Sequence, residues 1–115
     1  MNKNLLVKNL TSIIKLLSTK ERWTQGWYAK NKNGNNVGVI SKNAVCFCLI
    51  GAACRFREDD GEDETIGYLR NNLDQVWGNN LVGFNDSSTY EEVVSFLNRC
   101  LENAKNLPEN LTPKN

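Results

Sequence analysis

Four cysteines are the most chemically reactive residues of this chain, and three of them lie close together. Cys46, Cys48 and Cys54 fall within one short apolar segment, while Cys100 follows much later. A cysteine at the start of a helix can have a stabilised thiolate and act as a nucleophile. The apolar surroundings favour another interpretation, in which the thiols are reduced and buried, as in cytoplasmic proteins.

Histidine is absent from all 115 residues. Histidine is the usual proton shuttle, the partner of serine and cysteine nucleophiles and the commonest metal ligand. The glycines are isolated and form no phosphate-binding loop. Cys46 and Cys48 would point about 200° apart on a helix and could not hold one metal ion together. We therefore predict no catalytic residues, no metal site and no cofactor.

An aromatic and basic segment supplies the first candidate binding residues. Trp23, Gln25, Trp27 and Tyr28 lie among lysines and an arginine. Single-stranded nucleic-acid binders combine stacking surfaces with positive charge in this way. Tryptophans beside a small hairpin also commonly cover a hydrophobic core, so both interpretations stay open.

A second polar segment, residues 84–88, lies just before the last expected helix. Asn85 and Asp86 in it are typical of a turn, where their side chains bond local backbone amides. The functional alternative places Asp86 in a cleft beside Trp23 and Cys48. Such a cleft would serve a small ligand or a cysteine-dependent enzyme.

Charge is divided unevenly along the chain, although the net charge is only +1. Residues 1–42 carry eight Lys/Arg and one acid, whereas residues 43–115 carry six and twelve. The two halves either attract each other or are simply solvated. Alternatively, the basic region forms a face for nucleic acid or an acidic partner.

Hydrophobic periodicity predicts four helices and one hairpin. Apolar residues recur at helical spacing over 5–17, 45–56, 66–77 and 90–106. We expect Ser41 or Asn43 to cap the second helix, which is apolar nearly all round and therefore central. Its Gly51 would allow another element to approach closely. Overlapping capping boxes that begin at Ser88 and Thr89 start the last helix.

A short hairpin is expected between the first two helices. Its strands would be 27–29 and 37–40, joined by a turn at Asn33-Gly34, a dipeptide that favours positive φ. The acidic stretch 58–64 precedes the third helix, where the helix dipole favours acids, with a metal-binding loop as the alternative.

These elements predict a mainly α (α+β) fold, a compact four-helix domain with a small β-hairpin. Residues 1–107 would form a single globular domain and 108–115 a flexible C-terminal tail. Apolar runs fall short of the roughly 20 residues that a membrane-spanning helix needs. We therefore expect a cytoplasmic protein with no membrane partner.

An ordered set of short motifs resembles a family of small uncharacterised proteins from bacteria and their phages. In that family a Trp, an Ala with a following Gly, a Cys-Leu-x-Gly-Ala helix and a Trp-Asn-Asp turn recur in this order. The resemblance spans residues 23 to about 104 and departs at Phe84, where the family has tryptophan, and at Asn31, where an acid is common. It implies a shared small fold and a phage or mobile-element setting. The matching residues are Trp23-Thr24-Gln25-Gly26, Ala29, Gly34, Val37, Ala44, Cys48-Leu49-Ile50-Gly51-Ala52, Phe84-Asn85-Asp86 and Tyr90 to Val94.

The missing catalytic groups and the small size favour a non-enzymatic interaction protein, an accessory factor of a phage or bacterium that acts on a host or partner protein. A nucleic-acid-associated protein that uses its basic N-terminal region is the first alternative. A small-ligand binder or cysteine-dependent enzyme is the second. Homo-oligomerisation stays open in each case.

Overall fold

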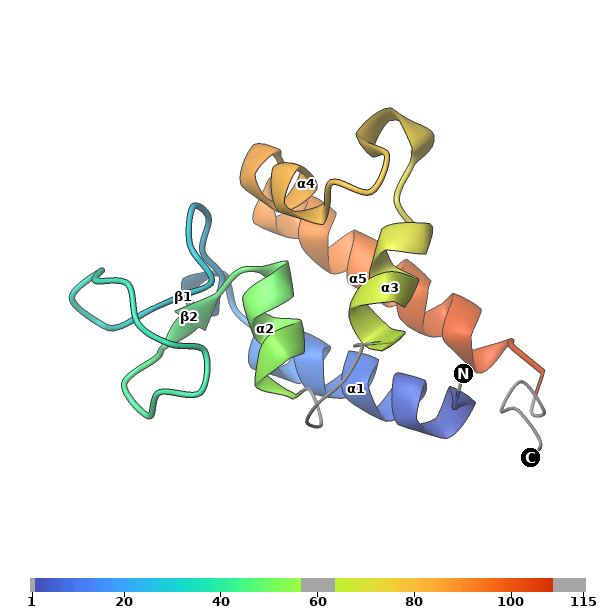
Figure 1. Cartoon of the computed structure of the whole chain (residues 1–115), viewed down its shortest axis with the longest axis horizontal. Coiled ribbons are helices and arrows are strands. Elements are labelled where there is room, and N and C mark those ends of the chain that lie inside the picture. Colours follow the sequence, from blue (N-terminus) through green and yellow to red (C-terminus); the bar gives the residue numbers. More distant parts are fainter. Residues whose placement is uncertain (1, 57–63, 109–115) are drawn as a thin grey trace.

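The computed structural model describes residues 2–56 and 64–108, which form mainly helices (Figure 1). These residues contain five α-helices and a two-stranded antiparallel sheet. The α+β class is therefore confirmed, while the number of helices exceeds the predicted four. Most of the acidic stretch 58–64 and of the predicted tail lies outside the described residues. The elements are α1 (Lys3–Leu16), η1 (Lys20–Arg22), β1 (Ala29–Lys30), β2 (Cys46–Phe47), α2 (Leu49–Arg55), α3 (Glu64–Asn71), η2 (Gln75–Trp77), α4 (Leu81–Ser87) and α5 (Tyr90–Lys105).

Helices α1 and α5 are the two longest elements, and both begin at side-chain caps. Asn2 caps α1 by accepting a hydrogen bond from the Leu5 amide. At α5, Thr89 and Glu92 form a complete capping box, which confirms the second of the two predicted boxes. Helix α5 ends at Lys105 with Asn106 as its C-cap, close to the predicted end.

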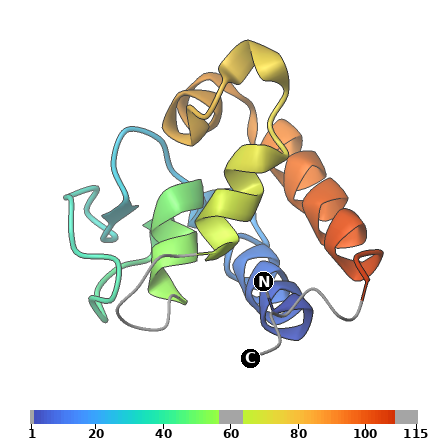
Figure 2. The same cartoon turned by 45° about the vertical axis from the view of Figure 1, so that its right-hand side comes forward.

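The hydrophobic core lies where α1 contacts α5, α2 and α3 (Figure 2). The apolar stripe predicted for the first helix is buried as expected, and the same holds for the inner face of α5. Side chains that meet here include Leu6, Leu10, Ile13, Leu69, Val93, Leu97 and Cys100.

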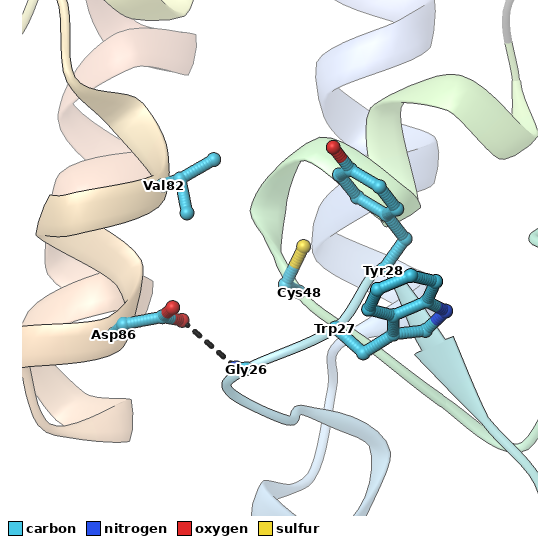
Figure 3. Close-up of a pocket in the computed structure, with 6 residues that line it drawn as sticks. All are labelled: Gly26, Trp27, Tyr28, Cys48, Val82 and Asp86. Atoms are coloured by element: carbon cyan, nitrogen blue, oxygen red, sulfur yellow. Dashed lines mark hydrogen bonds between the residues drawn. The ribbon is translucent and has the colours of Figure 1, made fainter. Parts of the chain in front are cut away.

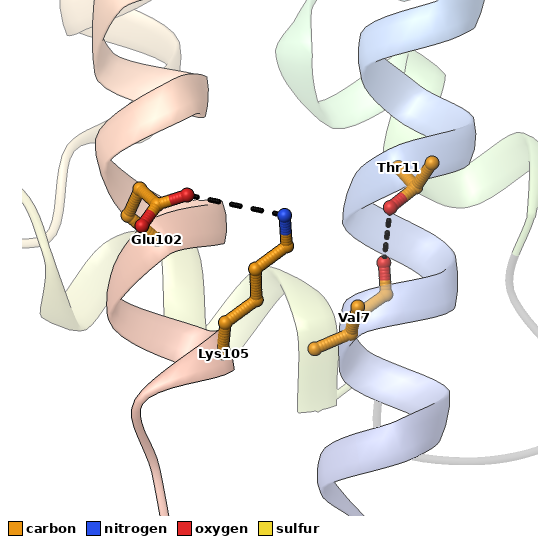
Figure 4. Close-up of polar contacts among 4 residues, drawn as sticks. All are labelled: Val7, Thr11, Glu102 and Lys105. Atoms are coloured by element: carbon orange, nitrogen blue, oxygen red, sulfur yellow. Dashed lines mark hydrogen bonds and ion pairs between the residues drawn. The ribbon is translucent and has the colours of Figure 1, made fainter.

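Figure 4 shows two polar contacts, each of which lies within one of these two helices. In α5 the Lys105 ammonium lies 3.9 Å from the Glu102 carboxylate, with both side chains more than half exposed. In α1 the Thr11 hydroxyl donates to the Val7 carbonyl of its own helix. Between the helices, the Tyr90 hydroxyl donates to the carbonyl of Leu17, the C-cap of α1, at 2.6 Å. Because one such bond contributes only about 1 kcal/mol net, apolar burial is the main contribution that holds the two helices together.

The predicted hairpin is wrong in its strand pairing. β1 pairs with β2, matching Ala29 with Phe47, whereas residues 37–40 form no strand. The predicted turn does form, since Gly34 has φ +83° and the Asn31 side chain accepts two amides across the turn. On the other edge of β1, the Lys30–Asn36 bridge follows this turn, and the Val37 amide donates to the Ala29 carbonyl at 3.0 Å. The contact stops there and does not extend into a strand.

The central helix is shorter than predicted. Pairing with β1 holds Cys46 and Phe47 extended, so α2 starts only after Cys48, whose thiol caps it. Neither Ser41 nor Asn43 is the cap. The close approach predicted at Gly51 is confirmed, because a Cβ atom there would lie 1.9 Å from the Tyr28 carbonyl oxygen.

The third predicted helix is divided, and a fourth helix replaces the predicted turn. Helix α3 ends at Asn71, and Val76 in η2 is 84% exposed instead of facing the core. Residues 81–87 form α4, capped by Asn80, which accepts from the Gly83 amide. Asn85 and Asp86 therefore lie on a helix next to α2.

Candidate functional site

The side chain of Asn85 connects three separate segments of the chain. It is 1% exposed. Its Oδ1 accepts from the Trp23 indole at 2.7 Å and from the Leu49 amide at 3.1 Å. Its Nδ2 donates to the Thr24 carbonyl at 3.1 Å and to the Asp86 carboxylate at 2.9 Å. The amide uses both donors and both acceptor positions, so none is left for a ligand.

Further hydrogen bonds hold the loop 23–26 against α4. Gln25 Nε2 donates to the main-chain carbonyls of Asn85 and Ser88, each at 3.1 Å. Asp86 Oδ1 accepts from the Gly26 amide at 3.1 Å. The side chains of Gln25 and Asn85, together with the Trp23 indole, therefore position the loop through internal bonds.

The chain that follows this loop is held against the start of α2. The Tyr28 carbonyl accepts from the Cys48 amide at 3.2 Å and lies directly against Gly51. The rings of Trp27 and Tyr28 nevertheless stay 46% exposed each, with their centroids 5.6 Å apart. A fixed backbone thus presents two aromatic side chains to solvent.

A pocket of about 190 Å³ opens between α4 and these two rings (Figure 3). Four predicted site residues line it: Trp27, Tyr28, Cys48 and Asp86. Trp23, Gln25 and Asn85, the other three, are not on its lining. Two residues that the sequence interpretation did not select as site residues, Gly26 and Val82, complete it. Val82 was not selected because the sequence analysis did not predict α4. The capping residue Asn80 was the only local signal for that helix.

Cys48 lies at this pocket as a thiol rather than a thiolate. Its side chain is 5% exposed, and Sγ accepts from the Gly51 amide at 3.3 Å. Burial raises the pKa of the Cys48 thiol, and the charge of Asp86 raises it further, whereas hydrogen bonds from the Gly51 and Ile50 amides lower it. Because the net shift is upward, this cysteine lacks the depressed pKa that nucleophilic cysteines have.

A second hollow of about 320 Å³ lies at the same two rings, lined by residues 36–39. Val37 and Val39 give it an apolar wall. Trp27 and Tyr28 line both hollows. Large aromatic side chains flanked by recesses are typical of protein-binding surfaces.

Two basic residues of the N-terminal region, and one of α2, have internal partners. Lys30 donates to the Gln25 carbonyl, and Arg22 donates to the Leu16 carbonyl. Arg55 of α2 lies over the Phe47 ring. Within residues 2–56 and 64–108, no three His, Cys, Asp or Glu side chains come together to hold a metal ion.

The chain belongs to DUF6197, a family of unknown function, whose sequence model matches residues 1–103. The match includes α1, which lay outside the motifs noted in the sequence. No curated protein matches the chain, and no solved structure does. None of the helices in the described part of the chain is long and apolar enough to cross a membrane.

Proposed function

We propose that the chain is a non-enzymatic binding protein that contacts a partner protein through the Trp27–Tyr28 surface. This surface consists of the two rings and the two hollows that both residues line. The observation that carries the proposal is the combination of a fixed backbone with two half-exposed aromatic side chains. Tryptophan and tyrosine are enriched among the residues that dominate protein–protein binding energies.

The chemistry of the surrounding groups supports binding over catalysis. The chain has no histidine, and the raised pKa of Cys48 keeps its thiol protonated. The Asn85 amide is fully occupied by internal hydrogen bonds. Among the described residues that line the pocket, no activated nucleophile accompanies the Asp86 carboxylate, and a binding surface needs none.

A setting as an accessory factor of a phage or bacterium is part of the proposal and rests on the motif resemblance. The partner would then be a protein of the same cell. Nucleic acid, which would use the basic residues 1–42, is the competing partner, and the test below separates the two.

The test is an affinity pull-down from lysate of the native host, with and without nuclease, using the tagged wild-type chain and Trp27→Ala. Val76→Ala is the matched control, because Val76 is 84% exposed in η2 and lines neither hollow. We expect a protein that the wild type and Val76→Ala retain after nuclease treatment and that Trp27→Ala loses. Equal capture by all three chains, or capture that disappears with nuclease, would refute the proposal.

A further inference from the structure

The pocket between α4 and the aromatic rings combines two faces of different character. Trp27, Tyr28 and Val82 supply apolar and aromatic surface, and Asp86 supplies a carboxylate. No lysine or arginine is among the described residues that line it. Lys30 lies a few residues after the loop 23–26 in the sequence, but its ammonium donates a hydrogen bond to the Gln25 carbonyl. The carboxylate is therefore available to a cation from outside.

The two oxygens of Asp86 differ in their surroundings. Oδ1 accepts from the Gly26 amide at 3.1 Å and from Asn85 Nδ2 at 2.9 Å. Oδ2 accepts no hydrogen bond from the described residues. An arginine pairs best with a carboxylate when both oxygens are open to its planar fork. A lysine ammonium is a compact point charge and needs only one oxygen.

The size of the pocket limits what can enter. Sites for drug-sized ligands and cofactors usually occupy about 300–1,000 Å³, whereas this pocket measures about 190 Å³. One long side chain fits that space better than a whole cofactor. Aromatic rings also attract cations through their quadrupoles, while the aliphatic part of a lysine packs on apolar surface.

We propose that this pocket receives a lysine side chain of the partner protein, with its ammonium at Asp86 Oδ2 and its aliphatic stem against Trp27, Tyr28 and Val82. The inference rests on the proposed function and names the chemistry that the partner must present. It makes the Asp86 charge, and not only the apolar surface, a determinant of binding.

The test uses two small probes. One is Nα-acetyl-lysine N-methylamide, which keeps its ε-ammonium group, and the other is its uncharged norleucine analogue. Binding is followed by NMR chemical-shift titration at the Gly26 amide and the Trp27 indole N–H of the full chain. We expect a dissociation constant of about 1–10 mM for the lysine probe and about tenfold weaker binding of the norleucine probe. An arginine analogue should bind no better than the lysine probe.

Asp86→Asn removes the charge but keeps an oxygen that can accept from the Gly26 amide, so the fold is retained. In this variant the lysine probe should lose its tenfold advantage over norleucine. Asp74→Asn is the control, because Asp74 is an exposed acid outside this pocket whose side chain caps no helix. It should bind both probes as the wild type does.

Equal binding of the two probes, no shift at tenfold higher concentration, or an unchanged lysine preference in Asp86→Asn would each overturn the inference. These failures are distinguishable from failure of the proposed function. If Asp86→Asn still retains the partner in the pull-down and Trp27→Ala does not, the lysine inference fails and the binding surface stands. If Trp27→Ala also retains the partner, the proposed function itself fails.

Discussion

Asn85 fixes the relative positions of three segments with a single amide group. It joins the indole and backbone of the loop 23–26 to α4 and to the first turn of α2. Leaving a buried polar group unpaired costs about 1–3 kcal/mol, whereas a satisfied bond gains only about 1 kcal/mol net. Removing Asn85 would leave the Trp23 indole, the Leu49 amide and the Thr24 carbonyl without this partner.

We therefore expect Asn85→Ala to lower the free energy of unfolding by about 3–5 kcal/mol. Chemical denaturation followed by circular dichroism measures this. Asn98→Ala is the control, because Asn98 is exposed on α5 and alanine favours a helix there. It should change stability by less than about 0.5 kcal/mol. A small effect of Asn85→Ala would mean that water replaces the amide at little cost.

At the scale of the elements, the contact between α2 and the segment before β1 depends on one missing side chain. A Cβ atom at Gly51 would lie 1.9 Å from the Tyr28 carbonyl oxygen, so the two backbones would have to separate. We expect Gly51→Ala to destabilise the protein by about 3 kcal/mol or more, since overpacking in a close contact is costly.

Gly67 provides the matched substitution in another helix. It is exposed on α3, and nothing lies within 4 Å of a Cβ atom placed there. Gly67→Ala should stabilise the protein by about 0.5–1 kcal/mol, because alanine is the better helix former. Thermal unfolding of the two variants side by side should therefore move the midpoint in opposite directions. Shifts in the same direction would contradict this account of Gly51.

Strong periodicity made α1 and α5 predictable from the sequence. Five apolar residues at helical spacing indicated the first, and the Thr89–Glu92 capping box indicated the start of the second. Helix α4 was missed because residues 81–87 include Gly83, Asn85 and Asp86, which are weak helix formers. Tertiary bonds from Asn85 stabilise it, and no local pattern shows them.

The apolar segment at 45–56 shows a second limit of sequence patterns. A short apolar run is compatible with both a buried strand and a buried helix. Here the partner strand β1 decides in favour of a strand at Cys46–Phe47. Residue chemistry was enough to select Trp27, Tyr28, Cys48 and Asp86, which line one pocket. Residue chemistry could not show that the Asn85 amide is fully occupied by internal hydrogen bonds.

At the scale of the whole molecule, the free energy of unfolding depends on pH in the alkaline range, because the core that α1 and α5 share contains a buried thiol. Burial raises the pKa of Cys100 in α5 from 9.0 to about 12, while Arg99 lowers it slightly. The folded state therefore holds this proton more tightly than the unfolded state. The resulting stabilisation is complete below about pH 9 and is lost as pH rises toward 12.

We expect the free energy of unfolding to fall by about 1.4 kcal/mol for each pH unit above 9 from this thiol alone. Denaturant titrations between pH 8 and about 10.5 measure the slope. Cys100→Ala removes the titrating group and should make the slope shallower by that amount, whatever its effect on stability at neutral pH. An unchanged slope would show that the Cys100 thiol ionises without unfolding.

The contact between Gly51 and the Tyr28 carbonyl has a consequence for how this protein can diversify. Tyr28 is held through its main-chain carbonyl, so the identity of the ring at position 28 contributes little to this contact. Trp27 and Val82 are also nearly half exposed. Residues at these three positions can therefore be exchanged at small cost to folding, and one backbone can acquire new binding preferences while its architecture is inherited unchanged.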